Sequence, residues 1–114
     1  MQTHGTWGER EVVYGDSSSL TTVLFLKKNK RCSWHKHKTA FNRFYVISGK
    51  LGVKTDNGLT IIGPKQSFEV APGIMHEFQT FELDTVIVEV AYVSYDPSDI
   101  HREKLGGENE RQGA

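Results

Sequence analysis

Short runs of β-branched and aromatic residues, each closed by turn-forming residues, are the feature that most constrains the fold of this chain. Gly15-Asp16-Ser17, Gly63-Pro64 and Pro72-Gly73 punctuate the runs, and no window before Tyr95 has helical periodicity. Frequent short strands between turns are typical of an all-β sandwich or barrel. We expect strands at residues 9–14, 20–26, 31–37, 41–48, 51–55, 59–62, 67–70, 76–81 and 85–93.

The chain divides into one domain and a tail. Asp56-Asn57-Gly58 predicts a tight hairpin, because Asn-Gly accepts the positive φ angles of a two-residue turn. After Tyr95 the composition changes, and Ser98 or Asp99 could cap a short helix that ends near Leu105. We expect a single barrel over residues 1–105 and a disordered, polar, Gly-rich tail over residues 106–114.

Size and charge restrict the partners. A chain of 114 residues suits one hydrophobic core, and its 14 basic and 14 acidic residues leave no net charge to attract nucleic acid or an anionic membrane. A small-molecule ligand is the better expectation. Cys32 is the single cysteine and is expected to be a small buried side chain. Without an apolar run for a signal peptide or a membrane span, the predicted location is the cytoplasm.

Two histidines one residue apart, His35 and His37, raise the question of a metal site. On a strand they share one face, so both imidazoles could converge on one ion. The same pattern also occurs on solvated strands that bind nothing. Asn42, and His76 at the end of the turn Pro72-Gly73-Ile74-Met75, are the further residues that favour a site.

Together these segments resemble the two motifs of the cupin family. The first is His-x-His, four residues, a carboxylate that is usually Glu, about six residues and Gly; the second is a Pro-rich turn, Gly, two residues and His. This resemblance implies a cupin-type double-stranded β-helix, a jelly-roll barrel of antiparallel strands. It also implies a divalent metal held by His35, His37, Asn42 and His76, with Gly49 closing the first motif.

Asn42 departs from the family pattern because it offers a neutral oxygen in place of a carboxylate. Three imidazoles would still suit Zn²⁺, Ni²⁺, Fe²⁺ or Mn²⁺, with a stronger Lewis acid and a weaker overall grip. The alternative is a metal-free cavity in which Asn42 is an ordinary polar strand residue.

Within the cupins the chain looks most like the small C-terminal domain of type II mannose-6-phosphate isomerases and its stand-alone relatives. The resemblance implies metal-dependent isomerisation of a sugar phosphate. The family's Arg-rich ending is thinned to Arg102 and Lys104, which puts the phosphate in doubt. Three-histidine dioxygenase chemistry and non-catalytic ligand binding remain alternatives, so whether the chain is an enzyme stays open. The residues that carry this resemblance are Trp7-Gly8, Tyr45 to Gly49, Gln66-Ser67, Val88-Glu89-Val90 and Ser98-Asp99-Ile100.

Four further residues are candidates for the site. Glu89 lies in a β-branched run and could be the catalytic base or a solvent-facing charge. Arg31 and Ser33 share the histidine face of their expected strand and could bind substrate, although an outer flank of the barrel suits Arg31 better. Phe44 shares a face with Asn42, as a cavity wall or as packing.

A homodimer is expected by analogy with other small barrels, which often pair an edge strand with a second copy.

Overall fold

The computed structural model describes residues 2–5 and 7–93, with side chains from Trp7 onward. This part of the chain is all β, and the expected helix after Asp96 and the tail lie outside it. The strands are β1 (Gln2–Gly5), β2 (Gly8–Gly15), β3 (Ser19–Leu26), β4 (Phe41–Ser48), β5 (Leu51–Thr55), β6 (Gly58–Ile62), β7 (Ser67–Val70), β8 (His76–Gln79) and β9 (Thr85–Tyr92).

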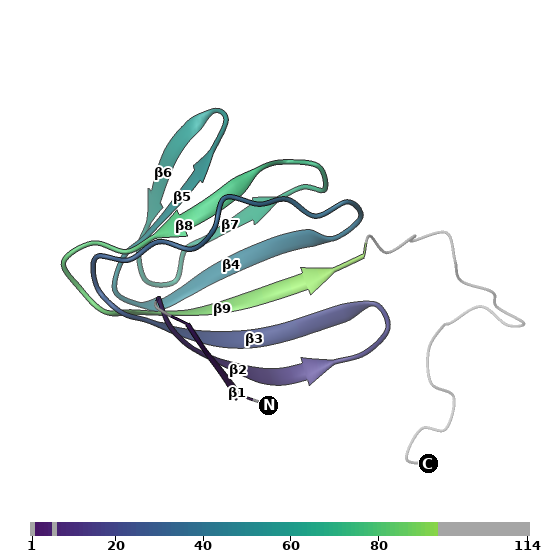
Figure 1. Ribbon diagram of the computed structural model, residues 1–114, viewed down its shortest axis with the longest axis horizontal. Helices are drawn as coiled ribbons and strands as arrows, with labels where there is room; N and C mark the ends of the chain where they lie inside the picture. Colours follow the sequence, from purple (N-terminus) through teal and green to yellow (C-terminus); the bar gives the residue numbers. More distant parts are fainter. Residues whose placement is uncertain (1, 6, 94–114) are drawn as a thin grey trace, which may run out of the picture.

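Two antiparallel sheets form the architecture. The larger has the order β1-β2-β3-β9-β4-β7 and the smaller the order β6-β5-β8. Figure 1 shows the smaller sheet on one side of the larger one, with the connection from β3 to β4 running past β8. Non-consecutive neighbours such as β3-β9-β4 produce the crossed connections of a jelly roll. The predicted all-β double-stranded β-helix is therefore the fold that is found.

The core lies between the sheets and follows the period-2 alternation of the strands. Leu24 and Leu26 of β3 and Phe44 and Val46 of β4 are at most 3% exposed, while Phe25 and Tyr45 between them face outward at 42%. Burial of each such side chain contributes roughly 1.5–3 kcal/mol to folding. The buried hydrophobic cluster consists of Leu24, Leu26, Phe44, Val46, Leu51, Val53, Ile62, Val70, Phe78 and Ile87.

The segment over residues 31–37, expected as a strand, pairs with β8 without forming a regular ladder. Its pairing is limited to two isolated bridges, Arg31 with Gln79 and His35 with His76. Cys32 N–H donates to the Phe78 carbonyl at 3.0 Å, but Phe78 N–H donates to Cys32 Sγ at 3.0 Å. A side-chain sulfur thus takes the place of a backbone acceptor, which interrupts the regular ladder at this point.

The expected strand boundaries agree with β4, β5 and β7, and the other ends differ by one or two residues. The short β1 was not expected. The 56–58 hairpin is present, with Thr55 paired to Gly58. Gly58 adopts a φ of +117° while Asn57 keeps a negative φ, so glycine alone provides the positive φ.

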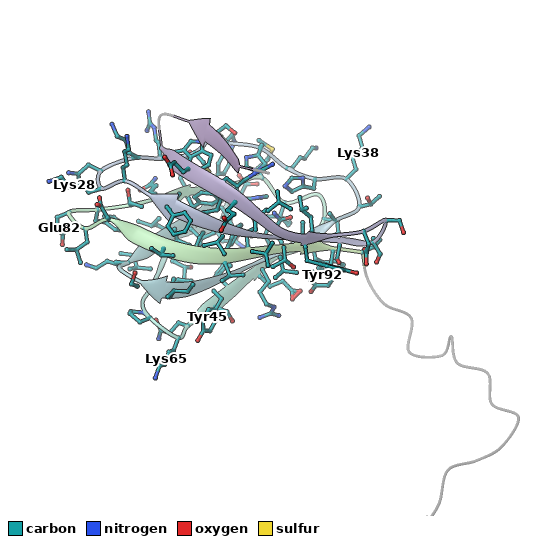
Figure 2. The ribbon with its side chains drawn as sticks, turned by 90° about the horizontal axis from the view of Figure 1, so that it is seen from below. Lys28, Lys38, Tyr45, Lys65, Glu82 and Tyr92 are labelled. Atoms are coloured by element: carbon teal, nitrogen blue, oxygen red, sulfur yellow. The ribbon has the colours of Figure 1, made fainter. Side chains whose placement is uncertain are left out.

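Charged side chains mark the two ends of the barrel. Figure 2 shows exposed Lys28 and Glu82 at one end and Lys38 at the other. Among the residues placed by the structure, no helix is long and apolar enough to cross a membrane.

Candidate metal centre and ligand cavity

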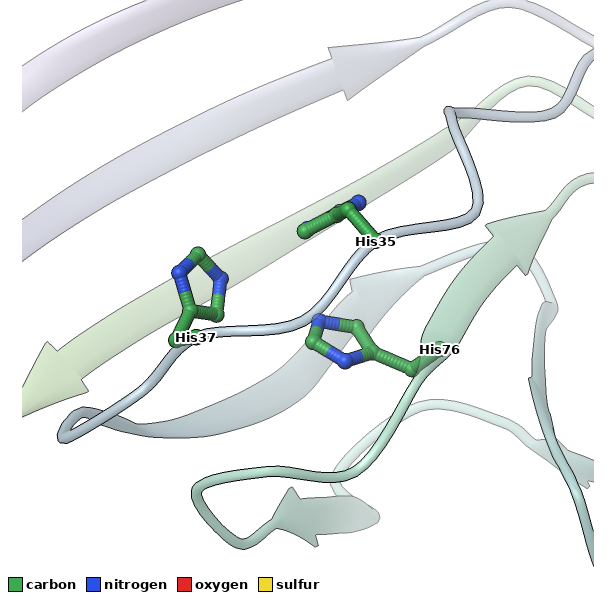
Figure 3. Close-up of side chains that lie close together, drawn as sticks. All are labelled: His35, His37 and His76. Atoms are coloured by element: carbon green, nitrogen blue, oxygen red, sulfur yellow. The ribbon is translucent and has the colours of Figure 1, made fainter.

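Three histidines converge from two segments of the chain. His35 and His37 come from the connection between β3 and β4, and His76 is the first residue of β8 (Figure 3). One nitrogen from each ring lies within 4.8 Å of the others. The ring centroids are 4.5 Å apart for His35 and His76, 5.1 Å for His35 and His37, and 5.5 Å for His37 and His76. The structure therefore brings the predicted histidines into one cluster.

Backbone pairing sets this arrangement. His35 N–H donates to the His76 carbonyl at 3.0 Å, and His76 N–H donates to the His35 carbonyl at 2.7 Å. Gly73 N–H donates to the His37 carbonyl at 2.7 Å from the turn before β8, where Gly73 has a φ of +83°. The Pro-Gly turn of the second motif thus holds the first motif in register.

Hydrogen bonds at Nδ1 orient two of the rings. His35 Nδ1 lies 2.8 Å from the Ser33 carbonyl and His76 Nδ1 lies 3.0 Å from the Ile74 carbonyl. Because a carbonyl oxygen only accepts, Nδ1 carries the hydrogen, and the lone pair of the neutral ring is at Nε2. A backbone carbonyl on the second nitrogen is a common way to orient metal-binding histidines.

The buried nitrogens lack partners. Nε2 of His37 and Nε2 of His76 are inaccessible and accept or donate no hydrogen bond. Burial lowers the pKa of both histidines, and the neighbouring His35 lowers it further. The neutral form that a metal requires is therefore favoured at neutral pH.

The donor set fits a divalent transition ion. Imidazole nitrogens bind Zn²⁺ at about 2.0–2.1 Å, so two of them on one ion can be at most about 4.2 Å apart. The cluster, with donors within 4.8 Å of one another, needs only slight convergence of the rings. Such an ion would coordinate the unpartnered nitrogens of the neutral imidazoles.

Asn42, expected as the fourth ligand, is bound to a carboxylate. It lies on β4 with 1% of its surface exposed, and its Nδ2 donates to Glu89 Oε2 at 2.6 Å. A carboxylate oxygen can only accept, so this contact fixes the orientation of the amide. Oδ1 of Asn42 is buried and has no hydrogen-bond partner.

A cavity of about 250 Å³ opens beside the histidines. Its walls combine apolar rings with both signs of charge, a combination that suits a small polar ligand. The lining residues are Trp7, Arg10, Leu24, Cys32, Ser33, His35, His37, Phe78 and Glu89.

The other predicted site residues lie at different depths. Glu89 and Ser33 line the cavity. Phe44 is fully buried, and its ring lies beside His76 with centroids 6.1 Å apart, so it supports the cluster from the core. Arg31 is exposed and lines a separate surface hollow with Asn29, Lys30, Gln79 and Thr80.

Arg10 is a cavity residue that the sequence did not single out. In the run Glu9-Arg10-Glu11 it resembles an ordinary solvated charge. The available signal was alternation: Arg10 and Val12 share one strand face, and a cation there faces the core side of the sheet.

Comparisons with known proteins support the fold. No family model and no curated protein matches the sequence. Among solved structures, KdgF from a Halomonas species has a TM-score of 0.73 at 16% identity, covering 82% of this chain and 86% of its own. An RmlC-like cupin from Shewanella frigidimarina has a TM-score of 0.71 at 17% identity, covering 79% of both chains.

A third structure extends the comparison to another protein. An uncharacterised protein from Klebsiella pneumoniae with a double-stranded β-helix domain has a TM-score of 0.70 at 20% identity, covering 80% of this chain and 81% of its own. Identities this low carry information about architecture alone. With its strand order and its histidine cluster, the chain has the double-stranded β-helix fold of the cupin-domain proteins.

Proposed function

We propose that this protein binds a divalent transition metal through His35, His37 and His76 and uses it to hold a small oxygenated metabolite. The observation that carries the proposal is the cluster of three histidines with Nε2 of His37 and His76 buried and unpartnered. In the absence of an ion, such nitrogens would be desolvated without compensation. Coordination would provide that compensation.

Asn42 and Glu89 complete the proposed site. The free Oδ1 of Asn42 is available as a fourth, neutral ligand, and the carboxylate of Glu89 places a negative charge next to it. When bound, the ion would polarise a carbonyl or hydroxyl of the ligand. Ser33, which lines the cavity, would contribute a hydroxyl.

Isomerisation of a sugar or sugar-phosphate-like metabolite is the reaction that we favour. It follows from the resemblance to the small cupin domain of mannose-6-phosphate isomerases, and the support from the structure is the position of Glu89. Its carboxylate lines the same cavity as His35 and His37, where a proton acceptor would be needed. A dioxygenase-type centre and a non-catalytic binding module are the alternatives.

Metal analysis tests the proposal. Protein purified without an affinity tag should contain close to one equivalent of a transition metal, or take it up on dialysis. The His37→Gln variant should retain less than a tenth of that amount. Lys36→Gln is the matched control, because Lys36 is exposed and lies between the two histidines without belonging to the cluster, and it should keep full occupancy. A metal-free wild type that takes up no ion would refute the proposal.

The metal found would separate the reaction classes. A redox-silent ion such as Zn²⁺, with turnover of aldoses to ketoses, would support isomerisation. Iron with consumption of dioxygen would support the dioxygenase alternative. A protein that binds both metal and ligand but shows no turnover would support the alternative of a non-catalytic binding module.

A further inference from the structure

Arg10 lines the ligand cavity that two of the histidines also line. It is on β2, and its register partner on β3 is Leu24, which is 2% exposed. Directly opposed residues of neighbouring strands point to the same face of a sheet, so Arg10 points inward. The same cavity is lined by His35 and His37.

The guanidinium of Arg10 forms no ion pair within the described residues. Its Nε is buried without a hydrogen-bond partner, and it forms none of the ion pairs found in this part of the chain. The acid that shares the cavity, Glu89, is hydrogen-bonded to Asn42 instead. A buried donor such as this Nε, left without an acceptor, costs on the order of 1–3 kcal/mol.

We propose that Arg10 is an anion subsite that binds the carboxylate or phosphate of a small hydroxylated ligand. This inference rests on the proposed function, in that it places the ligand in the same cavity. The guanidinium offers a planar fork of donors that matches the paired oxygens of either anion. The rings of Trp7 and Phe78 and the side chain of Leu24 line the cavity and limit the water that competes for these hydrogen bonds.

Glu89 restricts which other groups the ligand can carry. Its carboxylate repels a second anionic group and accepts a hydrogen bond from a hydroxyl. A ligand with one anionic end and hydroxyl groups along its chain therefore matches both charges of the cavity. Neutral sugars would leave Arg10 unpaired, and dianions with charge at both ends would meet Glu89.

The test compares three probes that differ in charge. Calorimetric titration of the metal-loaded protein with D-gluconate, D-glucose 6-phosphate and neutral D-glucitol should show at least one of the two anions binding about 10- to 100-fold more tightly than glucitol. This range corresponds to one charge-assisted hydrogen-bonded pair. Preference for gluconate or for the phosphate identifies which anion the subsite takes.

Variants of Arg10 separate the subsite from direct binding of anions to the metal. Arg10→Met should abolish the anion preference while metal content stays at the wild-type value, and Arg10→Lys should retain part of it. Arg31→Met is the matched control, since Arg31 is an exposed arginine that does not line the cavity, and it should change nothing.

Three outcomes would overturn the inference: equal binding of all three probes, binding of none, or an anion preference that survives Arg10→Met. The proposed metal site has a different readout, because metal content is measured separately for each protein. If the wild type holds no metal and still selects anions through Arg10, the subsite stands and the metal proposal falls.

Discussion

The amide of Asn42 and the carboxylate of Glu89 act as one unit beside the histidines. Their 2.6 Å hydrogen bond joins β4 to β9, with Asn42 opposite Ala91 and Glu89 opposite Phe44. The usual cupin carboxylate is absent from position 42, but a carboxylate is still present one strand away. The negative charge is therefore retained near the cluster without occupying the position of the expected ligand.

Replacing Asn42 with Asp would place two carboxylates in contact at this point. We expect Asn42→Asp to lower the free energy of unfolding of the metal-free protein at pH 7 by about 2–3 kcal/mol, since a hydrogen bond to a charged group is lost. The deficit should shrink as the pH falls, because one protonated carboxyl restores the donor. Added Zn²⁺ should also reduce it. Urea unfolding with chelator or with Zn²⁺ measures both effects.

The double variant Asn42→Asp with Glu89→Gln provides the control for this prediction. It reverses the direction of the hydrogen bond and should recover most of the lost stability. A single variant as stable as the wild type in the presence of chelator would show that the contact contributes little.

Cys32 is predicted to be chemically inert. Burial raises the pKa of its thiol to about 11, and the carboxylates of Glu77 and Glu89 act in the same direction. Only about one thiol in a thousand is then ionised at pH 8, and the thiolate is the nucleophile. Iodoacetamide at pH 8 should modify Cys32 at least tenfold more slowly than a free cysteine, with the difference lost in urea. Equal rates in the folded protein would contradict the burial argument.

At the scale of the elements, Gly49 fixes the connection between β4 and β5. It has a φ of +90°, and a Cβ built there would lie 2.6 Å from the Asp84 carbonyl oxygen and 2.7 Å from Thr85 Cα. Both of these atoms belong to the backbone, so they cannot move aside as the end of a flexible side chain could. Only glycine satisfies both the conformation and the packing at this position.

We expect Gly49→Ala to reduce the free energy of unfolding by at least about 3 kcal/mol, through left-handed strain and overpacking together. Gly58→Ala is the matched control, because Gly58 also has a positive φ but a Cβ there meets nothing within 4 Å. It should cost only about 1–2 kcal/mol. Urea denaturation of both variants measures the difference, and equal losses would rule out the steric contribution.

The elements were largely predictable because their signal is local. Alternation of apolar and polar residues identified β4 to the residue, since this strand buries one face. The Asp56-Asn57-Gly58 turn marked the end of β5. The connection over residues 31–37 was harder, because its pairing depends on the Cys32 sulfur accepting from a backbone N–H forty-six residues away. No sequence period encodes such a contact.

At the scale of the whole molecule, the outer face of the large sheet carries an apolar row on its central strands. Val23, Val88 and Tyr45 form one row across β3, β9 and β4, and Phe25 with Val86 continues it. Tyr45 is 42% exposed, and Figure 2 shows it on the outside of the barrel. An apolar surface continuous over three strands is typical of an interface.

We propose that this face pairs with a second copy of the chain, as expected by analogy with other small barrels. Tyr45→Glu should then shift the protein from dimer to monomer in light scattering coupled to size-exclusion chromatography, because a carboxylate in a buried interface is costly. Leu59→Glu, an equally exposed apolar position on β6 of the smaller sheet, should leave the dimer intact. A monomeric wild type would end this proposal.

The candidate site was predictable only in part. The histidine cluster could be predicted from the spacing of the histidines and from the Pro-Gly turn, since both motifs lie within single segments. Arg10 and the partner of Asn42 were not accessible in this way. The position of Arg10 follows from the pairing of β2 with β3. The contact of Asn42 with Glu89 follows from the pairing of β4 with β9, which brings together residues that are far apart in the sequence.

Because residues 31–37 pair irregularly with β8, a bound metal would hold these two segments together. Two of the proposed ligands are on the irregular segment and the third is on β8, about 40 residues further along the chain. An ion between them would cross-link the chain into a closed loop and clamp a segment that has only scattered backbone hydrogen bonds of its own. Loss of the ion would then loosen this wall of the cavity first, so that metal supply would set how well the site is formed.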